Sequence, residues 1–307
     1  MASWIREFAW REMADAELSS VSRAPAVGWG RGIFGDRGFL VGSAIVALLT
    51  LVALSADFIA PHDPYSQSLI RRLRPPAWYQ GGSWTYPLGT DAFGRDYLSR
   101  LIHGTRISLA VGAGAAIIAG LIGGGLGLLA GYVGGFADRL VSYIISTRLA
   151  LPSLLVALAI LQVGGSGLGI VILVLGLTHW DRFAVVMRIV TRQVRSRDYI
   201  TRARTIGCSD WRIVSREIAP NVFSHFIVVF TFEMAQCILA TAVLSFLGLG
   251  IQAPEPSWGL MMAEGRTWLS SAPWLITNAG LALMLLVLAI NLVGDGLRSS
   301  LTPEPRN

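Results

Sequence analysis

The sequence predicts an all-α polytopic membrane protein with six transmembrane helices. Of its 307 residues, 53% are hydrophobic and only 14% are charged, whereas about a quarter of the residues in a soluble domain are charged. The apolar residues gather in uncharged segments long enough to cross a hydrocarbon core of about 30 Å. A charged stretch, residues 198–221, interrupts them. Lipid is therefore the solvent for most of the chain, and this stretch must lie in water.

Polar segments divide the chain into five parts. Residues 1–37 lack the short apolar region and cleavage site of a removed signal peptide, so we expect a cytoplasmic tail there. The first transmembrane helix falls within residues 38–60, and residues 61–106, rich in Pro, Gly, Trp and Tyr, form an extracytoplasmic segment. Residues 107–297 then form a five-helix transmembrane core, and residues 298–307 form a second cytoplasmic tail.

The five spans of the core are expected at residues 107–137, 140–163, 168–187, 222–247 and 274–294. Glycines in the first of them recur four residues apart, as at Gly120 and Gly124 or Gly123 and Gly127. This spacing lines one helix face with small residues, so a neighbouring helix can approach closely. The second contains Pro152, which transmembrane helices tolerate, and we predict a single span through it.

The placement of arginine orients the bundle. Lys and Arg together number 25, and every one of them is arginine. Most lie in the N-terminal tail or between residues 182 and 216. The positive-inside rule places these regions, and with six spans both termini, in the cytoplasm. The arginines of the extracytoplasmic segment run against this bias, and Asp63, Asp91 and Asp96 offset them only in part.

The charged stretch at residues 198–221 is predicted to be a bent helical elbow made of two short helices. The first would run from Asp198 to Ile206 and end at Gly207, because glycine readily adopts the left-handed conformation of a helix end. Ser209 would then cap the second helix, and Pro220 is placed to begin the helix that follows.

The elbow has too few apolar residues for a core of its own and needs a partner surface. Asp198 and Arg202 are spaced for an i,i+4 ion pair. The apolar residues of the elbow are Tyr199, Ile206, Trp211, Ile213 and Ile218.

The elbow resembles the cytoplasmic coupling loop, the EAA-type motif, of permease subunits in binding-protein-dependent ABC importers. In that motif a Glu-Ala-Ala triplet precedes a glycine at a fixed distance, and Ile-x-Pro closes it. Thr201 and Arg202 stand where the family usually has Glu and Ala. The resemblance implies that this loop docks into a cleft of the ATP-binding subunit; the alternative is a solvated basic loop between two spans. The expected coupling residues are Thr201, Arg202, Ala203, Gly207, Ser209, Trp211, Arg212, Arg216 and Pro220.

Three further segments resemble the C-type subunit of the dipeptide and oligopeptide branch of these permeases. They are YPLGTDAFGRDYLSRLIHGTRISL at residues 86–109, LSFLGLGIQAPEPSWG at residues 244–259 and NLVGDGLR at residues 291–298. The resemblance implies a bacterial inner-membrane protein that pairs with a sister permease as a heterodimer. It also implies two ATP-binding subunits that hold ATP and Mg²⁺, and an extracytoplasmic solute-binding protein. The expected cargo is a dipeptide, an oligopeptide or a related solute such as a nickel chelate.

The GTDAFGRD part of the first segment predicts a chain of turns in which Asp91, Arg95 and Asp96 lock one another by salt bridges. We interpret it as a scaffold that holds the outer loop and helps to receive the binding protein; contact with substrate is the alternative. Trp258, near the end of a span, is interpreted as an interfacial anchor. The scaffold residues are Gly89, Asp91, Gly94, Arg95, Asp96 and Trp258.

Glu233 lies about 16 Å along the span expected at residues 222–247, near the middle of the membrane. A bare carboxylate is costly there, so it faces a wet cavity, is protonated or is paired. Together with Gln236 and Thr241 it predicts a polar stripe along the translocation path. Our hypothesis is that Glu233 lines this path and interacts with the amino end of a peptide. The alternative is an ion pair with Arg148 or Arg182 that only holds the bundle together.

The sequence also argues against several functions. A P-loop needs a lysine, and the chain has none, so it is not itself a P-loop ATPase. Cys208 and Cys237 form no CxxC pair and are interpreted as inert. The four histidines are dispersed, with no HExxH motif, and no serine lies in a GxSxG motif. We therefore expect no catalysis, metal or cofactor on this chain.

Three alternatives involve another partner or mechanism. The net charge of +6 suggests nucleic acid, but the arginines flank apolar spans, where membrane topology explains them. An ion-coupled secondary transporter is the main alternative function. It would need internal repeats and broken helices with paired carboxylates near the midplane. A membrane-embedded enzyme would need convergent His, Asp or Ser side chains within the spans.

Overall fold

The computed structural model describes residues 36–301, and the predicted tails at residues 1–37 and 298–307 lie largely outside this range. Within it the chain is helical apart from loops and one isolated bridge between Thr90 and Asp96. The predicted all-α class is confirmed. The helices are α2 (Arg37–Leu54), α3 (Ala56–Ile59), the 3₁₀ helix η2 (Leu69–Arg71), α4 (Tyr97–Val133), α5 (Gly135–Leu149), α6 (Ser153–Gly164), α7 (Leu168–Thr178), α8 (Trp180–Arg195), α9 (Asp198–Thr205), α10 (Asp210–Ile213), α11 (Ala219–Phe246), α12 (Trp258–Arg266) and α13 (Trp274–Leu301).

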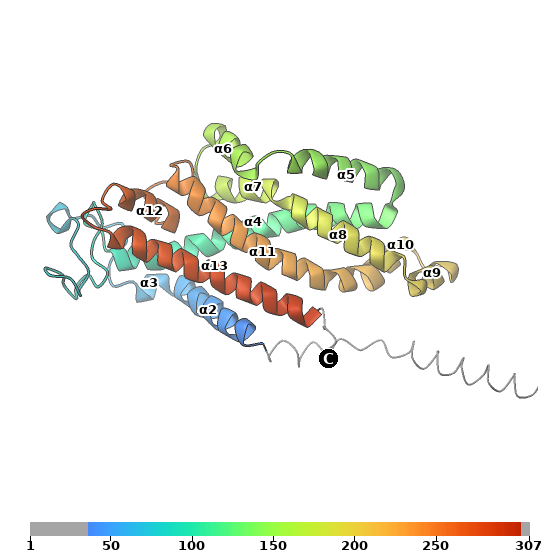
Figure 1. Cartoon of the computed structure of the whole chain (residues 1–307), viewed down its shortest axis with the longest axis horizontal. Helices are drawn as coiled ribbons and strands as arrows, with labels where there is room; N and C mark the ends of the chain where they lie inside the picture. The colour runs from blue at the N-terminus through green and yellow to red at the C-terminus, as the bar shows by residue number, and fades with distance from the viewer. Residues whose placement is uncertain (1–35, 302–307) are drawn as a thin grey trace, which may run out of the picture.

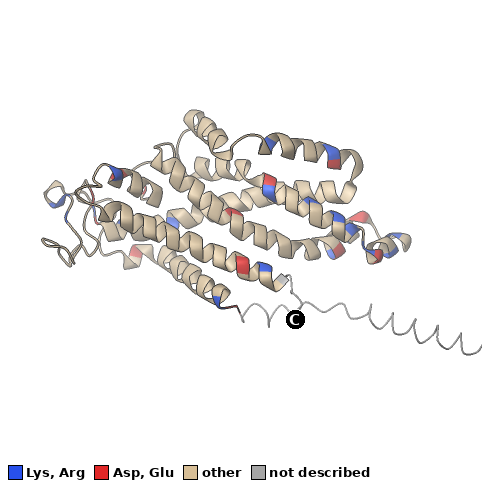
Figure 2. Cartoon of the chain, in the orientation of Figure 1, with Lys and Arg blue, Asp and Glu red and all other residues tan. Residues whose placement is uncertain are grey.

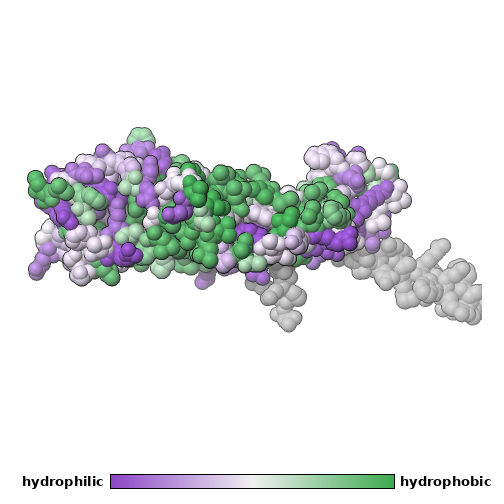
Figure 3. All heavy atoms as spheres, turned by 90° about the horizontal axis from the view of Figure 1, so that it is seen from above, coloured by the Kyte–Doolittle hydropathy of each residue, from purple (hydrophilic) through white to green (hydrophobic). Residues whose placement is uncertain are grey.

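The long helices form an elongated bundle whose two ends carry most of the charge. The loop between α3 and α4 lies at one end together with α12, and the elbow with α9 and α10 lies at the other (Figure 1). Lys and Arg, Asp and Glu gather toward these ends (Figure 2). Seen from above, a hydrophobic band separates two more hydrophilic ends (Figure 3). This is the pattern of a bundle that crosses a bilayer.

Five helical segments in the described range are long and apolar enough to span a membrane, and the bent pair α5–α6 is a sixth if it counts as one span. The pair bends by 81°, so the prediction of one continuous span through Pro152 is wrong. Pro152 lacks a backbone N–H and disfavours the helical conformation of the residue before it. Arg148 stabilises the break by donating hydrogen bonds to the carbonyl oxygens of Leu151 and Thr178.

Helix α4 is the axis of the bundle. It has 37 residues, which corresponds to about 55 Å, and begins at Tyr97 rather than after residue 106 as predicted. Asp96 sets this start, because its side chain accepts a hydrogen bond from the Ser99 backbone N–H at 3.2 Å. The polar first turns of α4 are buried by the outer loop instead of lying in water.

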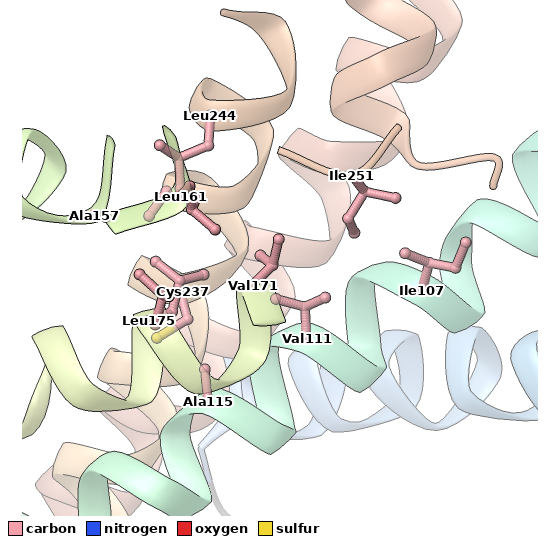
Figure 4. Close-up of a cluster of buried hydrophobic side chains, with 12 residues drawn as sticks. Ile107, Val111, Ala115, Ala157, Leu161, Val171, Leu175, Cys237, Leu244 and Ile251 are labelled. Atoms are coloured by element: carbon pink, nitrogen blue, oxygen red, sulfur yellow. The ribbon is translucent and has the colours of Figure 1, made fainter. Parts of the chain in front are cut away.

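The predicted small-residue face of α4 packs against α8. A Cβ atom on Gly123 would lie 2.0 Å from the Trp180 carbonyl oxygen, and one on Gly127 would lie 2.6 Å from that of Ala184. These glycines therefore allow the two backbones to meet. A buried apolar cluster from α4, α6, α7 and α11, with Val111, Leu175 and Cys237 among its members, fills the centre (Figure 4).

Helices α2 and α13 cover another side of the bundle. Gly42 on α2 lets the helices approach closely, since a Cβ atom there would lie 2.7 Å from the Ala289 carbonyl oxygen. Helix α13 continues to Leu301, beyond the predicted end of the sixth span at residue 294. Its last turns include polar residues because they extend past the apolar band.

Candidate functional site

The predicted bend of the elbow is present. Helix α9 ends before Gly207, whose φ of +87° lies in the left-handed region. The hydroxyl of Ser209 then accepts a hydrogen bond from the Arg212 backbone N–H at 3.4 Å and caps α10. Glycine is needed at the bend because L side chains rarely adopt this conformation.

The second limb of the elbow differs from the prediction of a separate short helix. After α10, residues Val214–Ile218 form a π-helical turn that leads directly into α11. Pro220 lies in the first turn of α11, directly after the π-helical turn. The elbow is therefore attached to a long span through an uninterrupted helical path.

Apolar residues of the elbow separate into two groups. Ile213 and Ile218 are buried in a cluster that also contains Ile200 from α9. In contrast, Ile206 is 82% exposed and Trp211 is 79% exposed. The elbow thus has a partner surface within its own chain on one side and an uncovered apolar surface on the other.

The predicted coupling residues lie on the outside of the elbow. Ala203 is half-buried, and the other eight are exposed. The expected ion pair between Asp198 and Arg202 is absent from the described residues. Both side chains are exposed, and an ion pair between exposed side chains contributes little to stability.

Tyr132 is a contact of the elbow that sequence reasoning missed. It lies at the end of α4, and its hydroxyl donates a hydrogen bond to Asp210 in the first turn of α10. The guanidinium of Arg204 stands 5.2 Å from the ring centroid, and that of Arg195 stands 6.0 Å from it. One tyrosine therefore connects α4 with both limbs of the elbow and with the end of α8.

A buried ion network holds the opposite end of the bundle. Arg95 Nε lies 2.6 Å from Asp91 Oδ2, and Arg100 Nη1 lies 2.6 Å from both Asp91 Oδ2 and Glu264 Oε2. Arg95 Nη2 also donates to Glu264 at 3.1 Å. The predicted Asp91–Arg95 pair is present, and the network ties α4 to α12 through two partners, Arg100 and Glu264, that sequence reasoning missed.

Asp96 does not join this network, contrary to the prediction. It caps α4 and accepts a hydrogen bond from the Ser99 hydroxyl, while His62 Nδ1 lies 3.3 Å from its Oδ2. Gly89 and Gly94 have φ of +79° and +70°, and a Cβ atom on Gly94 would lie 1.9 Å from the Ser68 carbonyl oxygen. The compact turns of the outer loop therefore require both glycines.

Trp258 is a buried structural residue rather than an interfacial anchor. It is 1% exposed, and its indole Nε1 donates to the Leu101 carbonyl oxygen at 3.0 Å. Gly104 makes room for it, since a Cβ atom there would lie 2.6 Å from the indole. Trp258 thereby fixes the beginning of α12 against α4.

An exposed contact, separate from the buried ion network, joins α3 to α4. Asp57 Oδ1 lies 3.3 Å from His103 Nε2, and Asp57 Oδ2 lies 3.2 Å from Arg106 Nη1. The hydrogen bond with His103 and the charge of Arg106 hold the pKa of Asp57 below its usual value. This pair lies in water, so it is weaker support than the buried network.

Glu233 lies buried in the middle of α11, with 0% exposure. Of the two predicted alternative partners, Arg182 is present, with its Nε 3.5 Å from Glu233 Oε1. Arg148 instead stabilises the break between α5 and α6. Beside Glu233, a cavity of about 470 Å³ opens between α8, α11 and α13.

Gln236 and Thr241 do not continue from Glu233 as one polar stripe. Gln236 lines a different cavity, of about 220 Å³, with Arg148 and Asp181. Thr241 is 6% exposed and donates to the Cys237 carbonyl oxygen at 2.8 Å. At about 100° per residue, Gln236 lies about 60° to one side of Glu233 around the helix and Thr241 about 80° to the other side, so the three side chains meet different surroundings.

Comparison with known families identifies the chain. Residues 123–307 match the binding-protein-dependent transport system inner membrane component family, and residues 31–76 match the N-terminal transmembrane domain of oligopeptide transport permease C. The first match covers more than half of the chain. The chain belongs to this permease family. This membership favours the importer permease over the ion-coupled carrier considered from the sequence.

Several curated relatives resemble this permease over most of its length. It is 42% identical over 269 residues to the dipeptide transport system permease protein DppC of Escherichia coli K12, covering 88% of this chain and 90% of the relative. It is 38% identical over 272 residues to the di/tripeptide transport system permease protein DppC of Pseudomonas aeruginosa, covering 89% and 90%. The dipeptide permease DppC of Haemophilus influenzae is 36% identical over 292 residues, with 95% and 99% covered.

A solved structure shares the fold of the permease. An inward-facing conformation of the MetNI methionine ABC transporter matches with a TM-score of 0.55 and 18% identity, covering 66% of this chain and 97% of that chain. The similarity supports a multi-pass permease fold. Among residues 36–301, no group of three or more His, Cys, Asp or Glu side chains is placed to hold a metal ion.

Proposed function

We propose that this permease forms, with a sister permease, the translocation path of an ATP-driven importer for dipeptides or oligopeptides. The peptide cargo is supported by relatives named as dipeptide and di/tripeptide permeases. Two ATP-binding subunits supply ATP hydrolysis with Mg²⁺, and an extracytoplasmic solute-binding protein delivers the peptide. The chain itself binds no cofactor. A related small solute such as a nickel chelate is the alternative cargo.

The proposal rests on the apolar side chains that the elbow exposes. Its outer side exposes Ile206 and Trp211, while its inner side packs on the same chain. Large apolar side chains exposed together are typical of a protein contact. The ATP-binding subunit docks here, and closure of the ATPase dimer moves the elbow and, through the π-helical turn, α11. The bundle then switches between outward-open and inward-open states.

The orientation follows from the same contact. ATP is available in the cytoplasm, so the elbow and both termini lie on the cytoplasmic side of the bacterial inner membrane. The loop between α3 and α4 and helix α12 then face the binding protein. The excess of arginine near the elbow supports this orientation. Glu233 lines the translocation path beside its cavity, whereas Gln236 and Thr241 occupy other surroundings.

Site-directed crosslinking tests the docking and the orientation together. Trp211→Cys, in a Cys208→Ser background, is expected to crosslink to the ATP-binding subunit and to resist a membrane-impermeant maleimide added from outside. Trp84→Cys is the matched control, since Trp84 is 83% exposed at the opposite end, and it is expected to react from outside. Labelling of Trp211→Cys from outside, or its failure to contact any ATPase, would contradict the proposed docking.

Transport by the complete system tests the cargo. Proteoliposomes with this chain, the sister permease, the ATP-binding subunits and the binding protein are expected to take up alanyl-alanine only when ATP is supplied. Nickel chelate serves as the competing cargo in the same assay. A chain that purifies alone and drives uptake from an ion gradient without ATP would contradict the importer mechanism.

A further inference from the structure

The cavity beside Glu233 has the dimensions of a binding site. Its volume of about 470 Å³ lies within the roughly 300–1,000 Å³ typical of small-ligand pockets. Its lining combines apolar side chains such as Phe232 with polar ones, which besides Glu233 are Arg182, His225, Thr231, Asn291, Asp295 and Arg298. Polar groups converging on an apolar cavity are what fix the orientation of a ligand.

Glu233 is the group that indicates a ligand. The residue is fully buried, and neither of its carboxylate oxygens has a hydrogen-bond partner among the described residues. Arg182 Nε lies 3.5 Å from Oε1, longer than the roughly 2.7–2.9 Å of a good charge-assisted hydrogen bond. A buried carboxylate without such bonds is costly. An ammonium group in the cavity would supply the missing donors.

Arg182 offers the complementary group. Its side chain is 54% exposed, and its guanidinium carbon stands 5.1 Å from the ring centroid of Phe232. Among the described residues its guanidinium makes no hydrogen bond within normal distance, so its N–H groups remain available to a carboxylate. Asp295 and Arg298 line the cavity together from α13 and bring opposite charges to it. One cavity therefore presents an acceptor for ammonium and donors for carboxylate.

We propose that this cavity binds a short zwitterionic peptide, with its ammonium group at Glu233 and its carboxylate at the guanidinium of Arg182. The inference rests on the proposed function and extends it, because it locates a solute-binding site within the permease itself. Recognition of both charged ends makes the site selective for short peptides with free termini.

Equilibrium binding to the assembled importer tests this site. Tritiated alanyl-alanine is added to the nucleotide-free complex of both permeases and the ATP-binding subunits, without the binding protein. Nanodiscs of phosphatidylcholine are used because its head group has no N–H donor that could occupy Glu233. The wild type is expected to bind the dipeptide. N-acetyl-alanyl-alanine is expected to bind at least about tenfold more weakly, because it has no ammonium group to form charge-assisted hydrogen bonds with Glu233.

Variants assign this discrimination to Glu233. Glu233→Gln is expected to weaken binding of the free dipeptide by a similar factor and to leave that of the acetylated dipeptide unchanged. Glu255→Gln removes the same charge from an exposed loop residue and is expected to change neither. If Glu233→Gln does not assemble, the comparison of the two ligands on the wild type still tests whether the site requires a free ammonium group.

Two results contradict the proposed site, and a third contradicts the proposed function on which the site rests. Equal binding of the free and acetylated dipeptides by the wild type contradicts recognition by Glu233. Absence of dipeptide binding in a complex that transports the dipeptide when the binding protein is added contradicts the site but leaves the proposed function standing. Absence of dipeptide uptake by the complete wild-type importer contradicts the proposed function, and the site falls with it.

Discussion

At the outer end of the bundle, Asp91, Arg95, Arg100 and Glu264 neutralise one another, and all but the partly exposed Glu264 are buried. At the elbow, by contrast, the apolar side chains of Ile206 and Trp211 remain exposed. The charges of the ion network have found their partners within the chain, whereas these two apolar side chains have not. The difference teaches which contacts hold the fold of a single chain and which side chains are left for another protein. Substitutions at the two ends should therefore fail in different ways.

The largest expected effect is loss of stability at the outer end. Arg100→Ala removes a guanidinium shared by Asp91 and Glu264, and breaking a buried ion pair in this way costs about 3–5 kcal/mol. Thermal unfolding of the purified chain in detergent is expected to shift to markedly lower temperature. Arg106→Ala is the control, because its pair with Asp57 is exposed, and it is expected to change stability far less. An equal shift for both variants would show that the network is not the main support.

At the elbow the next largest effect falls on assembly rather than stability. Trp211→Ala is expected to leave the free energy of unfolding within about 0.5 kcal/mol, as for other surface substitutions. The same change is expected to weaken binding of the ATP-binding subunit by about 2 kcal/mol, or roughly thirtyfold in Kd, as for a buried interface tryptophan. Trp84→Ala, exposed at the other end, should leave that Kd unchanged. Fluorescence-detected titration measures both variants, and equal values would remove the distinction between the ends.

A change at Gly207 separates the bend from the contact. Gly207→Val is expected to uncouple ATP hydrolysis from peptide uptake, because a β-branched side chain resists a φ of +87°. No atom lies within 4 Å of the added Cβ position, so the cost is backbone strain of about 1–2 kcal/mol rather than a clash. The measurement is the number of ATP molecules hydrolysed per peptide transported.

The control for this variant is Gly207→Asn, since asparagine tolerates the left-handed conformation. It is expected to retain most of the coupling. Normal coupling in Gly207→Val would show that the bend does not have to keep its geometry during transport.

Tyr132→Phe is expected to give the smallest effect. It keeps the ring beneath Arg204 but loses the hydrogen bond to Asp210, which contributes about 1 kcal/mol. Uptake per ATP hydrolysed is expected to fall severalfold, while the stability of the chain changes little. Tyr143→Phe, 71% exposed on α5, is the matched control and should behave as wild type. Identical coupling in the two variants would mean that α4 does not depend on this contact.

Local sequence signals predicted the bend of the elbow well because its geometry is local. Gly207, Ser209 and Pro220 each act on backbone groups within a few residues, so their effects can be read from spacing alone. The same signals were less decisive at Pro152. There the sequence does not show whether neighbouring groups will keep a helix continuous or, as Arg148 does, stabilise its break.

Long-range partners explain the rest of what the sequence did not predict. Glu264 joins Arg100 across 164 positions of the chain, and no spacing rule connects them. Trp258 was interpreted from its place near a span end, but Gly104 provides space for its indole on a distant segment. Glu233 was recognised from its position in an apolar span, whereas its cavity depends on how α8 and α13 pack around it.

Helix α4 has a mechanical consequence. At about 55 Å it is longer than the hydrocarbon layer, which is about 30 Å thick, so its two ends extend past that layer on opposite sides of the membrane. Tyr132 is hydrogen-bonded to the elbow at one end, and Arg100 is part of the buried ion network at the other. A tilt of about 5° around its midpoint displaces each end by about 2.4 Å. If the proposed docking moves the elbow, the opposite end of the bundle would therefore move with it as the far end of one rigid helix.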